Sequence, residues 1–324
     1  MSCTNLVDFD LERNSKIYVA GHSGLIGSAL VRRLKSEGFE NLLLRQRWEL
    51  DLCDQHPVTA FFEAESPDYV ILAAGRVGGI VANDRFPGDF IAQNLAIQLN
   101  VMTAARHSSV KRLIFLGSSC MYPASTPQPM HESQLLSGRP EQTSIAYALA
   151  KLAGVQMCLA FNQQERQTRF VPIIPNSVYG PFDNLDSESG HVLASLVRRL
   201  HDAKENGQQS ITLWGSGEPR REFIHSDDLA SAIVCLLNAK LRSDCLPLNI
   251  GSGNDISIKE LAAVVAEIVG YEGVVTWDVS KPDGALRKLL DSGRIRSMGW
   301  SPGVSLRHGI ANFYDWFLAN PVKT

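Results

Sequence analysis

The chain has 324 residues, of which 44% are hydrophobic and 20% charged, and its formal net charge is −3. This balance provides no broad basic field for nucleic acid or an anionic membrane, so neither is expected as a partner. The first fifteen residues lack the basic start and apolar run of a secretory signal, and no membrane-spanning segment is expected. The six cysteines are scattered without C-x-x-C spacing, which favours reduced thiols, a cytoplasmic location and no metal site.

Short apolar runs alternate with longer helical patterns through the first half of the chain. Five strands are predicted, at residues 16–20, 41–44, 69–73, 112–116 and 170–174. Helices are predicted between them, at residues 25–37, 57–64, 92–106 and 144–164. Strands that alternate with helices of ten or more residues are typical of βαβ units. The predicted fold class is therefore α/β, with a doubly wound, Rossmann-type parallel sheet.

The pattern changes after residue 177, where pieces rich in Gly, Pro and Asp separate the helical segments. Helices are predicted there at residues 191–204, 227–237 and 258–269. We expect residues 15–177 to form a dinucleotide-binding Rossmann domain, to which part of residues 211–251 returns. Residues 178–324 are expected to form mainly a smaller, substrate-binding lobe that covers the carboxyl edge of the sheet.

A glycine loop follows the first predicted strand and opens the first predicted helix. Glycine lets the backbone turn tightly and approach a pyrophosphate, whose charge then faces the N–H groups at the start of the helix. A tight turn alone also selects glycine, but the strand before and the helix after supply the context that the motif requires. The loop residues predicted to contact a dinucleotide are Gly21, His22, Ser23, Gly24, Leu25, Ile26 and Gly27.

Arg45 and Arg47 stand at the end of the second predicted strand, where an NAD enzyme usually places an acidic residue. A carboxylate there would repel a ribose 2′-phosphate, whereas arginine complements it. The pair therefore favours NADP(H), the alternative being two solvated surface arginines. The adenine and the path of the cofactor are expected to lie along four further residues: Asp51, Leu52, Ala73 and Ala74.

Tyr147 and Lys151 form a Y-x-x-x-K pair in an apolar helical segment. At this spacing the two side chains share one face of the helix. The ammonium group is expected to lower the pKa of the phenol, so that Tyr147 can exchange a proton with a carbonyl oxygen. Ser118 follows the fourth predicted strand, where its hydroxyl can hold the same oxygen.

The glycine loop, Ser118 and Y-x-x-x-K in this order resemble the extended short-chain dehydrogenase/reductase family. The stretches VGGIVAN at residues 77–83 and SSCMYP at residues 118–123 resemble more closely a branch of the family that acts on GDP-sugars. The similarity runs from about residue 16 to residue 318. It implies an NADPH-dependent enzyme that epimerises C3 and C5 of a GDP-linked 4-keto-6-deoxy sugar and then reduces C4, giving GDP-L-fucose or a close relative.

The resemblance assigns catalytic roles to five residues. Cys120 is implied as the base and His191 as the acid of epimerisation, while Ser118 and Tyr147 polarise the keto oxygen and Lys151 supports Tyr147. Thiol and imidazole have reference pKa values of about 8.5 and 6.5, so both exchange protons near neutrality. Taken singly, Cys120 would sooner be a core residue and His191 a residue at a helix start.

The resemblance also implies the remaining contacts of the two ligands. Arginines suit a diphosphate because they are permanently charged and bind bidentately. The implied cofactor contacts, besides Tyr147 and Lys151, are Pro175, Asn176, Val178 and His191. The implied substrate contacts, besides Ser118 and Cys120, are Ser119, Ser177, Arg199, Trp214, Arg221, Lys281 and Asp283.

Two positions depart from the family pattern. Ser23 stands where the loop commonly carries an arginine that contacts the 2′-phosphate, which predicts a weaker preference for NADPH. Ser177 stands where an asparagine commonly lies near the sugar diphosphate, which keeps open a GDP-colitose precursor or a 6-deoxyheptose as the substrate. Two further alternatives are a nucleotide-sugar 4-epimerase that holds NAD, and a catalytically silent NADP-binding protein.

The predicted helices at residues 92–106 and 144–164 have more apolar positions than one sheet can cover. In the family such a pair commonly forms a four-helix interface between two subunits. A homodimer is therefore expected.

Overall fold

The computed structural model describes residues 11–186, 190–281 and 283–320. A six-stranded parallel sheet organises the first lobe, with the strand order β2-β1-β3-β4-β5-β9. The strands are β1 (Ile17–Ala20), β2 (Leu42–Leu43), β3 (Tyr69–Leu72), β4 (Arg112–Leu116), β5 (Phe170–Pro175) and β9 (Leu248–Ile250). The doubly wound α/β class is confirmed, although the second predicted strand pairs over two residues only.

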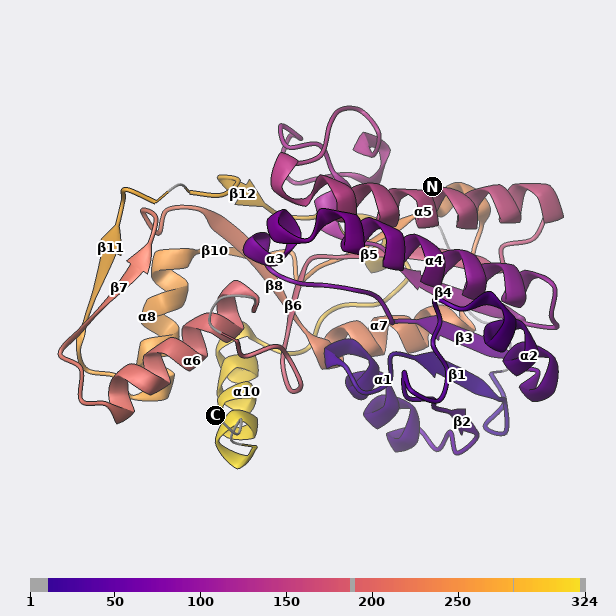
Figure 1. The fold of residues 1–324 in the computed structure, drawn as a ribbon, viewed down its shortest axis with the longest axis horizontal. Helices are drawn as coiled ribbons and strands as arrows, with labels where there is room; N and C mark the ends of the chain where they lie inside the picture. The colour runs from indigo at the N-terminus through magenta and orange to yellow at the C-terminus, as the bar shows by residue number, and fades with distance from the viewer. Residues whose placement is uncertain (1–10, 187–189, 282, 321–324) are drawn as a thin grey trace.

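Helices cover both faces of this sheet (Figure 1). One face carries α1 (Leu25–Ser36) and α7 (Ser226–Asn238), whose buried residues form one apolar core with the sheet. The other carries α2 (Gln55–Glu65), α4 (Pro87–Arg106) and α5 (Ile145–Glu165), which form a second core. Helix α4 begins five residues before the predicted start, because Pro87 suits the first turn of a helix.

A smaller lobe lies beside the carboxyl ends of the strands (Figure 1). It contains a four-stranded sheet and a two-stranded parallel sheet, with three helices around a third apolar core. The strands are β6 (Ser177–Tyr179), β8 (Arg220–His225), β10 (Asp255–Ser257) and β12 (Arg287–Lys288) in one sheet, and β7 (Ser210–Trp214) and β11 (Val274–Asp278) in the other. The helices are α6 (Val192–Glu205), α8 (Ile258–Val269) and α10 (Leu306–Ala319).

The chain passes between the two lobes more than once. It leaves the large sheet after β5, builds α6, β7 and β8 in the smaller lobe, and returns with α7 and β9. Two further helices are short: α3 (Ile80–Arg85), between β3 and α4, and α9 (Gly293–Ser297), between β12 and α10. Residues 226–250, which form α7 and β9, thus pack with the large sheet, and the expected domain bounds stay a prediction.

Helix α5 and the residues just before it, 142–165, are long and apolar enough to cross a membrane by length and composition alone. This differs from the expectation that no segment reaches that threshold. The helix packs against α4 and β5, and buries Lys151 and Asn162 with its apolar residues. We interpret it as a core helix of the large lobe.

Candidate active site

One cavity of about 1730 Å³ follows the carboxyl edge of the large sheet and continues between the lobes. Residues after β1, β3, β4 and β5 line one end, and residues of α6, β7, β8 and the loop after β11 line the other. Every residue that the sequence assigns to catalysis, cofactor or substrate lines this cavity, except His22. The topology thus brings predicted site residues together that are up to 262 positions apart in the chain, from Gly21 to Asp283.

The glycine loop takes the shape that a phosphate cradle requires. Gly21 has a φ of +81°, a region that other residues rarely adopt. Gly24 begins α1 with no side chain capping the helix, and the first turn contains no acidic residue. The N–H groups at this end of α1 are therefore available to an anion.

His22 differs from its loop neighbours. Its side chain is not part of the cavity lining, and its Nε2 atom lies 3.2 Å from the Nε2 atom of Gln46. The cofactor contact expected of His22 stays a prediction. The side chain links the glycine loop to the segment after β2.

The two arginines predicted for the 2′-phosphate have different surroundings. Arg45 donates to the backbone oxygen of Leu44 and forms an ion pair with Glu65, so its charge is already partnered. The side chain of Arg47 is 75% exposed and its Nε atom is 3.7 Å from the Asp51 carboxylate. Of the two guanidinium groups, that of Arg47 is better placed to receive an additional anion.

Tyr147 and Lys151 lie on α5 beside the end of β4. The Nζ atom of Lys151 donates to the Leu116 backbone oxygen over 2.9 Å and stands 5.8 Å from the Tyr147 ring centre. Burial lowers the pKa of Lys151 to about 8. Burial also raises the pKa of Tyr147, aided by Cys120 and opposed by a hydrogen bond with Ser118.

The sequence-based expectation of a lowered pKa for the Tyr147 phenol is therefore wrong for this structure. Desolvation has the largest effect on Tyr147, so the pKa of its phenol is raised overall. A phenol with a raised pKa keeps its proton at neutral pH. It suits the donation of a proton to a developing alkoxide better than the removal of one.

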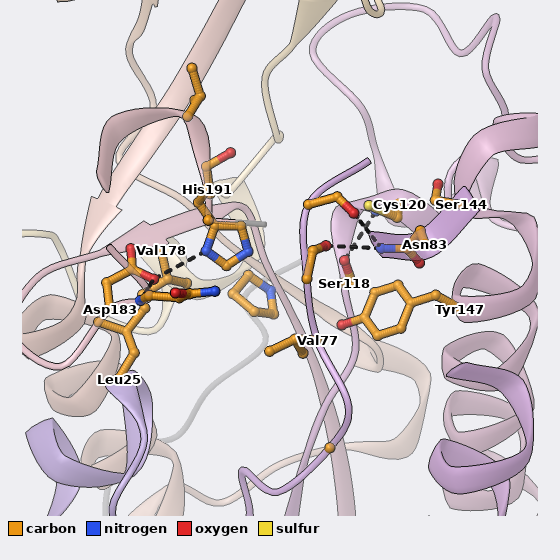
Figure 2. Close-up of a pocket in the computed structure, with 18 of the residues that line it drawn as sticks. Leu25, Val77, Asn83, Ser118, Cys120, Ser144, Tyr147, Val178, Asp183 and His191 are labelled. Carbon is orange, nitrogen blue, oxygen red and sulfur yellow. Dashed lines mark hydrogen bonds and ion pairs between the residues drawn. The ribbon is translucent and has the colours of Figure 1, made fainter. Parts of the chain in front are cut away.

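Cys120 and His191 face the same cavity from opposite walls (Figure 2). Cys120 belongs to a single turn of 3-10 helix, Ser119–Met121, which Ser118 caps by accepting a hydrogen bond from the Cys120 N–H over 3.3 Å. His191 precedes the first residue of α6, and its Nδ1 atom is 3.2 Å from an oxygen of Asp183. The two walls place a thiol and an imidazole on either side of one space.

The smaller lobe supplies the cationic and aromatic residues. Arg221 is part-buried and donates to the Ala285 backbone oxygen over 2.6 Å, and burial lowers its pKa. Arg199 donates to the Thr212 backbone oxygen over 2.7 Å. The Lys281 ammonium lies 5.6 Å from the ring centre of Trp214, whose side chain is exposed at the cavity.

Three of the predicted contact residues are held by partners in the protein. Ser119 donates to Asn176 over 3.0 Å, and Asn176 donates in turn to the buried carboxylate of Glu222 over 2.8 Å. Asp283 accepts hydrogen bonds from the N–H and hydroxyl of Ser216. These side chains brace the ends of β4, β5 and the loop after β11, and Glu222 is a residue that the sequence analysis missed.

Two residues that do line the cavity, Asp183 and Asn83, were also missed. Asp183 has no feature in the sequence that distinguishes it from other loop acids. Asn83 closes the VGGIVAN stretch and donates to the backbone oxygens of Gly78 and Gly79. Asn83 lies beside Ser118 and Cys120 (Figure 2). The resemblance carried by the VGGIVAN stretch could therefore have identified Asn83 as a site residue.

The fold and the shared cavity define a dinucleotide-dependent enzyme class, and the chain belongs to the NAD dependent epimerase/dehydratase family, whose model matches residues 17–251. This confirms the resemblance seen in the glycine loop and Y-x-x-x-K. The chain is 50% identical to GDP-L-fucose synthase 1 of Arabidopsis thaliana over 309 residues, 95% of each protein. It is 44% identical to GDP-L-fucose synthase of Escherichia coli strain K12, over 94% of this chain and 97% of that protein.

A solved structure is similar to this chain over nearly its whole length. The GDP-mannoheptose C4 reductase of Campylobacter jejuni, with NADP bound, superimposes with a TM-score of 0.87 at 38% identity. The match covers 95% of this chain and 99% of the other.

Proposed function

We propose that the protein epimerises C3 and C5 and reduces C4 of a GDP-linked 4-keto-6-deoxy sugar with NADPH, giving GDP-L-fucose. The observation that carries the proposal is the single cavity in which Cys120 and His191 face Ser118 and Tyr147 (Figure 2). An epimerase needs an acid and a base on opposite faces of the sugar ring, and a carbonyl reductase needs a proton donor at the oxygen. The names of the relatives at 44–50% identity support the same reading.

The residues present fit a bound NADPH. The uncapped start of α1 would take the pyrophosphate, Arg47 the 2′-phosphate, and Asp51, Leu52, Ala73 and Ala74 the adenosine half. Pro175, Asn176 and Val178 would border the nicotinamide, together with Tyr147, Lys151 and His191. The bound cofactor supplies the hydride.

Epimerisation is assigned to Cys120 and His191. The 4-keto group acidifies the protons on C3 and C5, and Cys120 as thiolate removes one of them. Ser118 and Tyr147 donate hydrogen bonds to the oxygen, which carries the negative charge of the resulting enolate. His191 returns a proton to the carbon from the opposite face, so that the configuration inverts.

Reduction is assigned to Tyr147. As C4 becomes tetrahedral, Tyr147 donates its phenolic proton to the keto oxygen. Its raised pKa keeps that proton in place until then. Lys151 places a positive charge 5.8 Å from the ring centre and stabilises the phenolate that remains.

The GDP half is assigned to the smaller lobe. Arg221 and Arg199 would neutralise the diphosphate, and the exposed ring of Trp214 would pack against the base. The same part of the cavity is also lined by Ser177, Lys281 and Asp283. Ser119 would border the sugar. In this assignment residues 15–177 and the returning part of 211–251 hold the cofactor, and residues 178–324 mainly hold the substrate.

Deuterium uptake at C3 and C5 without NADPH tests the assignment. Exchange in the parent protein should nearly vanish in Cys120→Ser, because the serine hydroxyl has a far higher pKa than the thiol. General acid–base groups contribute about 10²–10⁴-fold, so the loss is large enough to measure. Tyr147→Phe should retain part of the exchange while NADPH oxidation nearly stops. Undiminished exchange in Cys120→Ser would remove Cys120 from the mechanism.

A second candidate is C4 reduction of a related sugar, such as a GDP-colitose precursor or a GDP-6-deoxyheptose. Ser177 in place of the usual asparagine and the similarity to a heptose C4 reductase favour it. Product analysis by mass spectrometry and NMR on a panel of GDP- and dTDP-linked 4-keto sugars separates the two. C4 reduction without exchange at C3 or C5 would support this second candidate.

The proposal includes a location and an oligomeric state: the protein is a cytoplasmic homodimer. The support for a dimer is an apolar surface on α4 and α5, formed by the exposed side chains of Leu95, Leu99 and Leu149. Adjacent helices with exposed leucines lose apolar surface to water when a second copy covers them.

A further inference from the structure

We infer that Asp183 is a positioning residue for His191, whose Nδ1 atom it occupies so that Nε2 alone serves the sugar. The inference rests on the proposed function, in which His191 is the acid of epimerisation. It adds a residue that neither the sequence motifs nor the assigned contacts include.

The contact is built from the loop after β6. Asp183 is buried, and its Oδ1 atom accepts a hydrogen bond from the Asn184 N–H over 2.8 Å besides facing His191 Nδ1 at 3.2 Å (Figure 2). The Asp183 N–H donates to the Gly180 backbone oxygen, and the Phe182 ring packs at 5.1 Å from that of Trp316. The loop therefore fixes the carboxylate independently of His191.

The carboxylate has few partners to neutralise it. Its second oxygen, Oδ2, is buried and accepts no hydrogen bond within the part of the chain that the structure describes. The side chain of Asp183 is only 3% exposed, so water does not compensate the charge. An imidazole N–H at His191 Nδ1 is consequently the main side-chain donor available to it.

Two opposed fields act on His191. It stands at the N-terminus of α6, where the helix dipole disfavours a cation. Asp183 has the opposite effect: its hydrogen bond and its charge raise the pKa of His191, against the lowering by burial. In the described residues Asp183 is the charged group that shifts it, since the Arg199 guanidinium, two turns along α6, is directed to Thr212.

The consequence is a fixed direction of proton transfer. With Nδ1–H held by Asp183, only Nε2 can deliver a proton to the sugar carbon or take one back. A raised pKa means that a larger fraction of His191 carries both protons at neutral pH, which is the form that acts as an acid. His191 without its carboxylate would more often be neutral, and either nitrogen would carry its single proton.

Asp183→Asn tests the pairing because it removes the charge and preserves the size. The pKa of His191, followed by NMR of the imidazole, should fall because the carboxylate that raises it is gone. Deuterium exchange at the carbon that His191 serves should drop about tenfold or more near neutral pH, and its optimum should move to lower pH. Reduction of an already epimerised 4-keto sugar should fall less than exchange does.

Asp202→Asn is the matched control, because Asp202 forms a part-buried ion pair with Arg198 on α6, outside the cavity. It should change neither the His191 titration nor exchange. An unshifted His191 titration in Asp183→Asn would overturn the inference. If that variant does not fold, a parent His191 that titrates at or below about 6.5 would overturn it instead. The titration needs no substrate, so it is decided separately from the proposed function.

Discussion

Lys151 is a cation that the fold holds away from water. Its side chain is buried, its ammonium donates to Leu116, and its pKa is lowered to about 8. The unfolded chain keeps this proton until about pH 10.5. Between these values the unfolded state binds more protons than the folded state, so the folded state gains stability as the pH rises.

Lys151→Met should remove this pH dependence of stability, because methionine does not titrate. The free energy of unfolding of the parent, relative to that of Lys151→Met, should increase by about 1 kcal/mol for each pH unit between roughly 8 and 10. Urea unfolding at several pH values measures it. Lys111→Met is the control, because the exposed Lys111 pairs with Asp68 and its pKa is raised instead. A parallel pH dependence in both variants would contradict the lowered pKa.

At the scale of single residues, the sequence predicted which side chains meet in the site better than it predicted their burial and pKa. Tyr147, Lys151 and Ser118 were placed together because Y-x-x-x-K spacing and strand ends are local properties. The pKa of Tyr147 was not predicted correctly, because burial by residues distant in the chain decides it. Asp183 was missed for a related reason: its contact with His191 depends on how one loop closes, and no spacing rule describes that closure.

The turn between β1 and α1 depends on the close approach of two backbone segments. A methyl group at Gly27 would overlap the Gly21 backbone oxygen, whereas one at Gly88 would meet nothing within 4 Å. Both glycines lie in the first turn of a helix. They therefore form a matched pair that separates helix propensity from packing.

Gly27→Ala should lower the free energy of unfolding by about 1–3 kcal/mol, because the overlap is with backbone that cannot move aside. Gly88→Ala should leave it unchanged or raise it by up to about 1 kcal/mol, as alanine favours a helix. Denaturant unfolding of both variants gives the comparison, and NADPH titration should show weakened binding in Gly27→Ala only. A stability gain in Gly27→Ala would show that the turn relaxes.

Whole elements were predictable where the apolar runs were long. Strands β1, β3, β4 and β5 are continuous buried runs and were found, as was helix α8 with both its ends. The short strands of the smaller lobe were not found. Strand β7 is largely exposed and β12 has two residues, so their pairing is set by partners elsewhere in the chain and not by their own pattern.

At the scale of the molecule, the leucines on α4 and α5 predict the response of the proposed dimer to a charge. Leu99→Glu places a carboxylate in the centre of an interface that would exclude water, so it should yield monomers. Light scattering at micromolar concentration measures the mass. Leu318→Glu, at an equally exposed leucine on α10, is the control and should remain dimeric. A monomeric parent protein would contradict the proposal outright.

The return of the chain to the large sheet has a consequence for its synthesis. On the ribosome, β5 is complete at Pro175, yet the strand that pairs with its free edge begins only at Leu248. The apolar face of α1 is likewise uncovered until α7, which packs against it, has been synthesised. At about 5–20 residues per second, the nascent chain carries an unpaired β-edge and an uncovered apolar face for several seconds. The interval in which the chain is most prone to aggregate therefore coincides with translation of the segment that contains most of the residues proposed to bind the GDP-sugar.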